Sequence, residues 1–197
     1  PPGFALEDFR HPKSRVVFPK DKLIIGYSGA IGSRLDYPLL YELIKRNPQW
    51  RFVFWGPIQI VEGENEEEIK KNIESLLHYN NVVHGFSKKK SEVAWVVNHF
   101  DICIIPYDIR QDQNKYCLPM KLLEYQYFSK PIISVPIIEL FHTEYDIKIA
   151  RNYIEWEKYI ENININVPMI LRRKSTYIFH SWNEKAQEIN LCLEMYE

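Results

Sequence analysis

The most constraining feature of the sequence is the alternation of short apolar runs with amphipathic segments. Five runs of strand type are apolar on both faces, and they cover residues 23–27, 52–55, 82–84, 102–105 and 132–135. Apolar residues at helical spacing lie between them, for example Leu40, Leu43 and Ile44. Buried strands that alternate with amphipathic helices form βαβ units, in which helices cover both faces of a parallel sheet. The sequence therefore predicts a doubly wound α/β domain.

The same pattern continues toward the end of the chain. A sixth strand is expected near 146–149 and a helix around Trp156, which gives a Rossmann-type sheet of about six strands. Ser181 and Glu184 have the spacing of a capping box, in which each side chain satisfies a backbone donor at a helix start. A last helix with an apolar stripe is therefore expected over 181–197.

Helix starts are indicated by residues that favour the first turn. Asp36, Asn65 and Ser91 stand before three of the helical patterns and are typical N-cap residues. Pro119 suits the first position of a further helix, because its missing amide proton has no partner there in any case.

Composition and charge limit the class of protein. The 197 residues, with a formal net charge of -1, have the length of one domain and no overall field that draws nucleic acid. Cys103, Cys117 and Cys192 lack CxxC spacing and the histidines lack ligand spacing, so neither a disulfide framework nor a metal site is expected. No apolar run is long enough to span a bilayer, and the residues Pro1–Phe4 lack the basic and apolar regions of a signal peptide. The cysteine usage leads us to expect a reducing cytoplasm.

Two loops carry residues that could bind a ligand at the carboxyl ends of the strands. Residues 26–33 contain Gly29 and Gly32, which could form a phosphate cradle or only permit a turn. Their spacing is not GxGxxG, and no acidic residue directly follows the second strand, so an NAD-dependent enzyme is disfavoured. Tyr107 begins a long polar loop after the fourth apolar run, and long loops of this kind are usually functional or mobile.

Lys121 and Glu124 form a third candidate site. They lie three residues apart at an expected helix start, so both head groups reach the same side. A cation and a carboxylate placed together could bind a pyrophosphate and the hydroxyls of a ribose. Spacing alone favours the simpler alternative of a solvated ion pair.

Several motifs occur together in one order along the chain. PMKLLEY at 119–125, with SKPIIS at 129–134, is similar to a donor-binding signature PxKxxEY…GKPVV. The remaining matched segments are IGYSG followed by Asp36-Tyr37, NPQWR and FVFWGP at 47–57, NVVHGF at 81–86, and FDICIIPY at 100–107. Together they resemble the C-terminal domain of GT-B glycosyltransferases near family 4 and the related glucuronosyl and teichuronic-type transferases.

The resemblance implies a division of the chain into three parts. Residues 1–20 are similar to the segment that joins the two Rossmann-like domains of a GT-B enzyme, and 21–180 correspond to its nucleotide-sugar binding domain. Residues 181–197 are expected to pack as a helix on this domain or on a missing N-terminal acceptor domain. Because the chain begins at Pro1 without Met, the resemblance implies one half of a longer enzyme.

The resemblance also implies roles for individual residues. Glu124 would bind the ribose of a UDP- or GDP-sugar, and Lys121 its diphosphate, with no cofactor besides this donor substrate. Further diphosphate contacts are expected from Gly29, Gly32, Ser33 and Met120, and the base or sugar is expected near Gly85, Phe86, Tyr107, Pro119 and Tyr116. No catalytic residue is assigned, since a catalytic base is expected on the missing domain.

Two departures from the family pattern keep alternatives open. Tyr116 stands where family 4 enzymes have a first Glu, and no Arg and Lys pair follows Gly56-Pro57. The main prediction is a glycosyltransferase that passes sugar to a polysaccharide, lipid-linked or related acceptor. The alternatives are a catalytically inactive nucleotide-binding or interaction module and a GT-B nucleotide-sugar epimerase. Lys88–Lys90 could also touch anionic lipid at the inner face of a membrane, although a solvated loop is the simpler interpretation.

Overall fold

A six-stranded, wholly parallel sheet organises the protein. The computed structural model describes residues 6–60, 65–163 and 186. The strands are β1 (Ile24–Ser28), β2 (Arg51–Trp55), β3 (Val82–Gly85), β4 (Ile102–Ile105), β5 (Ile132–Ser134) and β6 (Ile147–Ile149). Their order is β3-β2-β1-β4-β5-β6, with parallel pairing throughout. This is the Rossmann strand order, so the predicted fold class is confirmed, including the sixth strand.

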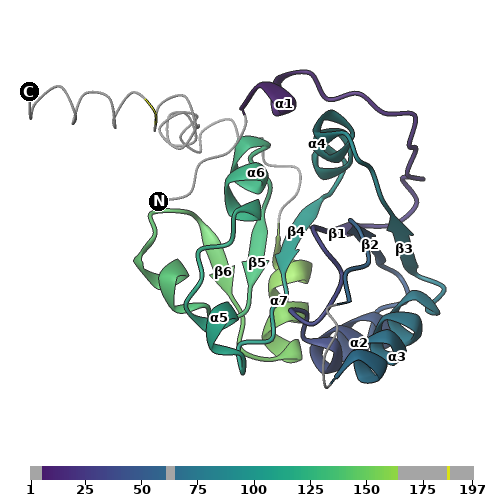
Figure 1. Ribbon diagram of the computed structural model, residues 1–197, viewed down its shortest axis with the longest axis vertical. Helices are drawn as coiled ribbons and strands as arrows, with labels where there is room; N and C mark the ends of the chain where they lie inside the picture. The colour runs from purple at the N-terminus through teal and green to yellow at the C-terminus, as the bar shows by residue number, and fades with distance from the viewer. Residues whose placement is uncertain (1–5, 61–64, 164–185, 187–197) are drawn as a thin grey trace, which may run out of the picture.

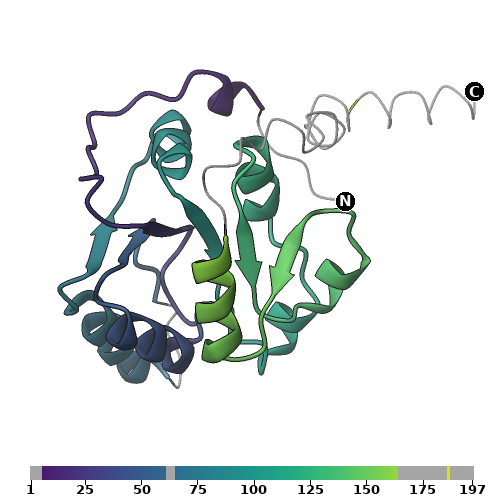
Figure 2. The same cartoon turned by 180° about the vertical axis from the view of Figure 1, so that it is seen from behind.

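Helices cover both faces of the sheet. They are α1 (Leu6–Arg10), α2 (Tyr37–Arg46), α3 (Glu66–Leu77), α4 (Lys90–Asn98), α5 (Asp112–Lys115), α6 (Lys121–Tyr127), the 3₁₀ helix η1 (Ile138–His142) and α7 (Tyr153–Asn162). Figures 1 and 2 show α2, α3 and α7 on one face and α1, α4 and α6 on the other. The loops that leave the carboxyl ends of the strands are therefore carried by a sheet that is supported on both sides.

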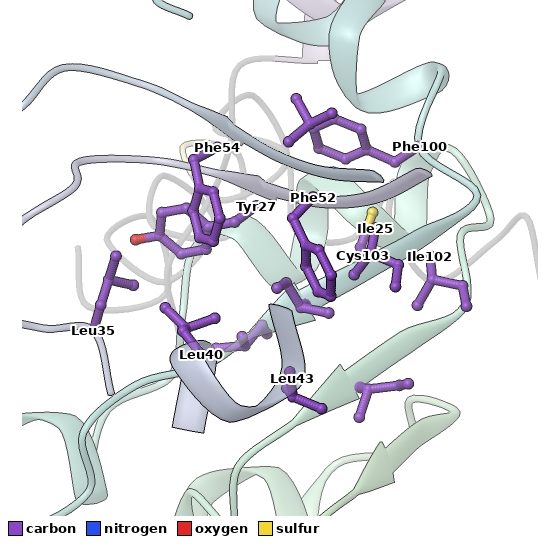
Figure 3. Close-up of a cluster of buried hydrophobic side chains, with 14 of the residues drawn as sticks. Ile25, Tyr27, Leu35, Leu40, Leu43, Phe52, Phe54, Phe100, Ile102 and Cys103 are labelled. Carbon is purple, nitrogen blue, oxygen red and sulfur yellow. The ribbon is translucent and has the colours of Figure 1, made fainter. Parts of the chain in front are cut away.

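The core lies between the central strands and the two helical layers. Tyr27 and Phe54 come from adjacent strands with ring centroids 6.1 Å apart, and Leu40 and Leu43 of α2 pack nearby (Figure 3). Gly26 sits against Phe100, because a Cβ built at residue 26 would come within 2.1 Å of the phenyl ring. Close packing of this kind tolerates little added volume, which makes the centre of the sheet rigid.

The helix starts agree with the sequence only in part. Asp36 caps α2, since its Oδ1 accepts the amide of Leu39 at 3.1 Å. The side chain of Asn65 makes no capping hydrogen bond. Ser91 was the wrong residue, because the carbonyl of Lys89 already closes the first turn of α4. Pro119 was also wrong as a first helical residue, since α6 begins at Lys121.

The described part of segment 1–20 packs on the domain. The amide of Lys13 donates to the carbonyl of Ser91 at 3.2 Å, Trp95 Nε1 donates to the carbonyl of Val16 at 3.1 Å, and Phe18 is buried in the core. The capping box at 181–184 and the apolar stripe expected after it lie outside the described residues, apart from residue 186. Within the described ranges, no helix is long and apolar enough to cross a membrane.

Candidate functional site

The candidate residues meet at the point where the strand order reverses. β1 lies between β2 and β4, so the chain leaves β1 in one direction and β4 in the other, and doubly wound sheets bind their ligands at the carboxyl ends of two such strands. The loop after β1 and the loop after β4 are joined there by an antiparallel bridge between Leu35 and Tyr107. Helix α6 completes the same region, because its residue Tyr125 reaches β1.

Lys121 is a buried cation at this switch point of the sheet. Its side chain belongs to the first residue of α6, the residue is 9 % exposed, and its Nζ donates a hydrogen bond to Tyr107 Oη. The ammonium also lies over the rings of Tyr27 and Tyr107, 4.7 and 4.5 Å from their centroids. Aromatic faces stabilise a cation but do not neutralise it. Within the described part of the chain, no carboxylate lies within 4.0 Å of this ammonium, so it can receive an anion.

Glu124 lies one helical turn further along α6. Its side chain is 16 % exposed, and the closest cation is the ammonium of Lys90 on α4, 4.0 Å from its Oε1. Burial raises the pKa of the Glu124 carboxyl, while Lys90, Lys121 and hydrogen bonding with Ser28 oppose the rise. The carboxylate therefore does not form the solvated pair with Lys121 that spacing favoured. It keeps oxygen atoms that could accept hydroxyl hydrogen bonds.

A hydrogen bond to β1 fixes the position of α6. Tyr125 is fully buried, and its hydroxyl accepts the backbone amide of Ser28 at 2.9 Å. The Ser28 hydroxyl lies 3.3 Å from the same oxygen. Because Ser28 is the last residue of β1, this contact ties the helix that carries Lys121 and Glu124 to the end of the central strand.

Two backbone amides of the glycine loop after β1 are already hydrogen-bonded to the end of β2 and the segment after it. The amides of Gly29 and Ile31 donate to the carbonyls of Trp55 and Pro57, both at 2.9 Å, so they are not available as phosphate donors. A Cβ at Gly32 would meet the Gln59 carbonyl oxygen at 2.2 Å, so packing requires glycine at that position. Gly29 has a positive φ of 140° and lies beside Lys121, because a Cβ there would be 3.4 Å from its Nζ.

Arg34 is a second cation beside Tyr107, and no pattern in the sequence indicates it. Its guanidinium carbon lies 4.3 Å above the Tyr107 ring, and its Nε donates to Asn114 Oδ1 at 2.7 Å. Asn114 is fully buried and its Nδ2 also donates to the carbonyls of Arg34 and Asp108. The two partners are 80 residues apart, so only the fold brings them together. A buried amide that holds an arginine on an aromatic ring gives that cation a defined orientation.

The remaining candidates lie around this centre. The carbonyl of Ser33 accepts Gln111 Nε2 at 2.6 Å, which joins the two loops. Pro119 is buried before α6, whereas Met120, Tyr116 and Phe86 are exposed. Gly85 ends β3, and its carbonyl accepts the amide of Gly56 at 2.8 Å. The structure thus gathers Gly29, Tyr107, Lys121 and Glu124 closely and leaves Gly85 and Phe86 two strands away from β1.

The strand order defines a Rossmann-like α/β domain with its candidate site at the switch point of the sheet. Residues 9–142 match the family described as glycosyl transferases group 1, and the chain belongs to this family. It is 25 % identical over 122 residues to TuaH of Bacillus subtilis strain 168, whose name describes a glycosyltransferase of teichuronic acid biosynthesis. That match covers 62 % of this chain and 29 % of TuaH.

Solved structures show the same fold at low identity. A sucrose-phosphate synthase from Thermosynechococcus elongatus matches with a TM-score of 0.73 and 15 % identity, over 100 % of this chain and 51 % of the synthase. Anabaena Alr3699/HepE, solved in complex with UDP-glucose, matches with a TM-score of 0.65 and 14 % identity, over 98 % of this chain and 56 % of HepE. The chain thus spans about half the length of these solved proteins.

Proposed function

We propose that this chain is the donor-binding domain of a glycosyltransferase that uses a UDP- or GDP-sugar. The observation that carries the proposal is the buried ammonium of Lys121, which has no carboxylate within 4.0 Å in the described ranges and lies at the switch point of the sheet. A buried charge without a counter-ion is costly in free energy, and an anionic ligand offsets that cost. The site therefore fits a ligand that carries a diphosphate.

Each neighbouring group has a use in this reaction. Breaking the bond between sugar and diphosphate leaves more negative charge on the diphosphate, and a fixed cation stabilises that charge as it develops. Lys121 supplies one cation and Arg34 the other, with Tyr107 between them. The ionised Glu124 accepts the ribose hydroxyls. HepE was solved with UDP-glucose, which supports a uridine nucleotide. The acceptor would be a polysaccharide, lipid-linked or related molecule held by a domain outside this chain.

Calorimetric titration with UDP, GDP, ADP, NAD and uridine tests the proposal. One of the first two nucleotides should bind, and Lys121→Met should weaken it by about 10- to 150-fold, the value of a lost charge-assisted hydrogen bond of about 1.5–3 kcal/mol. Lys121→Met should affect UDP more than uridine, whereas Glu124→Gln should weaken both. Lys71→Met, on the exposed surface of α3, is the matched control. Unchanged affinity in both site variants refutes the assignment.

Activity of the longer protein separates the transferase from its alternatives. Product analysis with and without an acceptor distinguishes sugar transfer from epimerisation of the donor. Donor binding without turnover supports the inactive nucleotide-binding module, an alternative that Tyr116 keeps open. A reducing cytoplasm is the location we propose, because the cysteines of the sequence lack the spacing of a disulfide framework.

A further inference from the structure

Tyr107 contacts both cations of the proposed donor site. The ammonium of Lys121 lies 4.5 Å from the centroid of the Tyr107 ring and donates a hydrogen bond to its Oη. The guanidinium carbon of Arg34 lies 4.3 Å from the same centroid. Tyr107 itself is only 2 % exposed, so its side chain acts on a ligand through these two cations. One buried ring therefore connects two charged side chains that come from different segments of the chain.

The backbone around Tyr107 is fixed on both sides. Tyr107 follows β4 and forms an antiparallel bridge with the loop after β1. Before it, the carbonyl of Pro106 accepts the amide of Asp36 at 2.9 Å. After it, the amide of Asp108 donates to the carbonyl of Arg34 at 2.8 Å. These bonds hold the ring at one position relative to the two central strands.

The hydroxyl of Tyr107 determines where the Lys121 ammonium lies. An ammonium has three N–H donors and no acceptor. Among the described residues, its hydrogen-bond acceptor is Tyr107 Oη, and the ring of Tyr27 lies 4.7 Å away. Two donors therefore remain for a ligand. A lysine side chain is flexible and would sample other rotamers without this acceptor.

The ring of Tyr107 determines where the Arg34 guanidinium lies. The Arg34 side chain is exposed, and exposed arginines ordinarily sample many rotamers. Here its Nε donates to Asn114 Oδ1 at 2.7 Å, its Nη2 donates to Cys117 Sγ at 3.4 Å, and the aromatic ring lies beneath the guanidinium. Within the described ranges it forms no ion pair with a carboxylate. The ring thus orders a cation whose charge is available to a ligand.

Two cations held against one ring repel each other. Both distances are measured to the same centroid, so the charges of Lys121 and Arg34 are neighbours. Like charges favour separation, and long side chains can move apart into water. Contact with one fixed aromatic group opposes that movement, because an aromatic face attracts a cation. A ligand with two adjacent anionic groups relieves the repulsion, and a diphosphate has this charge pattern.

We propose that Tyr107 is a positioning residue that presents Lys121 and Arg34 together to the diphosphate of the donor. This rests on the proposed function, since it concerns the same site. The hydroxyl positions Lys121, and the ring positions both cations. Ordering two long side chains costs conformational entropy, and a fold that orders them beforehand leaves less of that cost to binding. Tyr107 is thereby assigned to the diphosphate, whereas the resemblance implied a place near the base or sugar.

Titration of the full chain with UDP, UMP and uridine tests the role of Tyr107. Tyr107→Phe removes only the hydroxyl and should lower UDP affinity by roughly 3- to 10-fold, whereas Tyr107→Leu also removes the ring and should lower it by roughly 10- to 100-fold. UMP should lose less than UDP, and uridine should bind all three proteins equally, because it carries no phosphate. Tyr41→Phe is the matched control, since its hydroxyl donates to the carbonyl of Asn72 at 2.8 Å on the helical layer, and it should leave every affinity unchanged.

A double-mutant cycle distinguishes positioning from a merely structural role. In a Lys121→Met background, Tyr107→Phe should have no further effect on UDP affinity, because the hydroxyl acts through that ammonium. Tyr107→Leu should still weaken UDP there, through Arg34. NMR of the ligand-free proteins adds a readout that needs no nucleotide. The side-chain nitrogen signal of Lys121 should lose its ordered character in Tyr107→Phe, and the signals of both Lys121 and Arg34 should lose it in Tyr107→Leu.

Two results would overturn the proposal. One is an equal loss of affinity for UDP, UMP and uridine in the Tyr107 variants, which would show a structural role. The other is a loss in Tyr107→Phe that persists unchanged beside Lys121→Met. If the wild type binds UDP and neither Tyr107 variant weakens it, the donor site stands and the role of Tyr107 is refuted. If the wild type binds no nucleotide while the NMR signals change as expected, the donor site is refuted and the positioning of the two cations is retained.

Discussion

Replacing Gly56 with alanine tests how tightly the end of β2 supports the proposed site. A Cβ at this position would come within 2.0 Å of the carbonyl oxygen of Gly29, and an ordinary carbon–oxygen contact is about 3.3 Å or more. The backbone at residues 29 and 56 must therefore move apart by roughly 1 Å or more. The backbone on both sides is hydrogen-bonded, so the movement cannot be confined to one residue.

The size of the effect follows from the contacts that the movement breaks. Gly29 donates to Trp55 at 2.9 Å and Gly56 donates to Gly85 at 2.8 Å, and each such bond contributes about 0.5–1.5 kcal/mol. Overpacking at a buried position adds about 1–3 kcal/mol. The expected loss in the free energy of unfolding is thus about 2–6 kcal/mol, or a fall in Tm of roughly 4–24 °C for a chain of this length.

Urea unfolding followed by tryptophan fluorescence measures this loss, and UDP titration measures its effect on the site. Gln59→Ala, an exposed change in the same loop, is the control and should stay within about 0.5 kcal/mol of the wild type. Because Gly29 lies beside Lys121, Gly56→Ala should also weaken UDP binding at least tenfold. A loss of stability below about 1 kcal/mol with unchanged UDP affinity would refute the reasoning, since the loop would then absorb a methyl group freely.

Three further predictions follow from other contacts. Burial raises the pKa of Glu124, so its ionisation opposes folding, and the free energy of unfolding of the wild type falls as pH rises from the ordinary pKa to the raised one. Glu124→Gln should therefore be more stable than the wild type at pH 7 and equally stable at pH 4. Urea unfolding that shows the wild type to be more stable at pH 7 would contradict this. Asn114→Ala removes hydrogen bonds to Arg34 and Asp108 and should lower the free energy of unfolding, measured with urea, by about 2–4 kcal/mol. A loss below about 1 kcal/mol would show that this amide does not hold Arg34. Ser129 follows α6 with a φ of 52°, which is unfavourable for a residue with a Cβ. Ser129→Gly should therefore raise Tm by roughly 2–4 °C, and Ser129→Val should lower it. Calorimetric scans that show no difference between the two variants would exclude backbone strain at this residue.

The sheet could be predicted from the sequence because strands that are buried on both faces consist of short continuous apolar runs. All six strands were expected close to where they occur, and β6 was expected from the short run 146–149. The starts of α4 and α6 could not be predicted, because an N-cap depends on backbone torsion angles and not only on residue type. At Ser91 the residue type was suitable, yet the helix had already begun.

The candidate site could be predicted only where its residues are close in the sequence. Lys121 and Glu124 share one helix, so their spacing placed them together, although burial and the absence of an ion pair between them could not be deduced. Arg34 and Asn114 are joined across 80 residues, and no local pattern indicates such a pair. Likewise, the glycines suggested a phosphate cradle, whereas the backbone bonds of Gly29 are visible only in the folded chain.

The strand order also determines when each strand can pair while the chain is being synthesised. β1 gains its neighbour β4 only after the chain has grown from Ile24 to Asp101, a separation of 77 residues. At the usual rate of about 5–20 residues per second, a ribosome needs roughly 4–15 s to make that stretch. During this time β1, β2 and β3 can pair, but the side of β1 that later receives β4 presents open amide and carbonyl groups. The nascent protein is therefore most exposed to faulty association in the interval before β4 emerges.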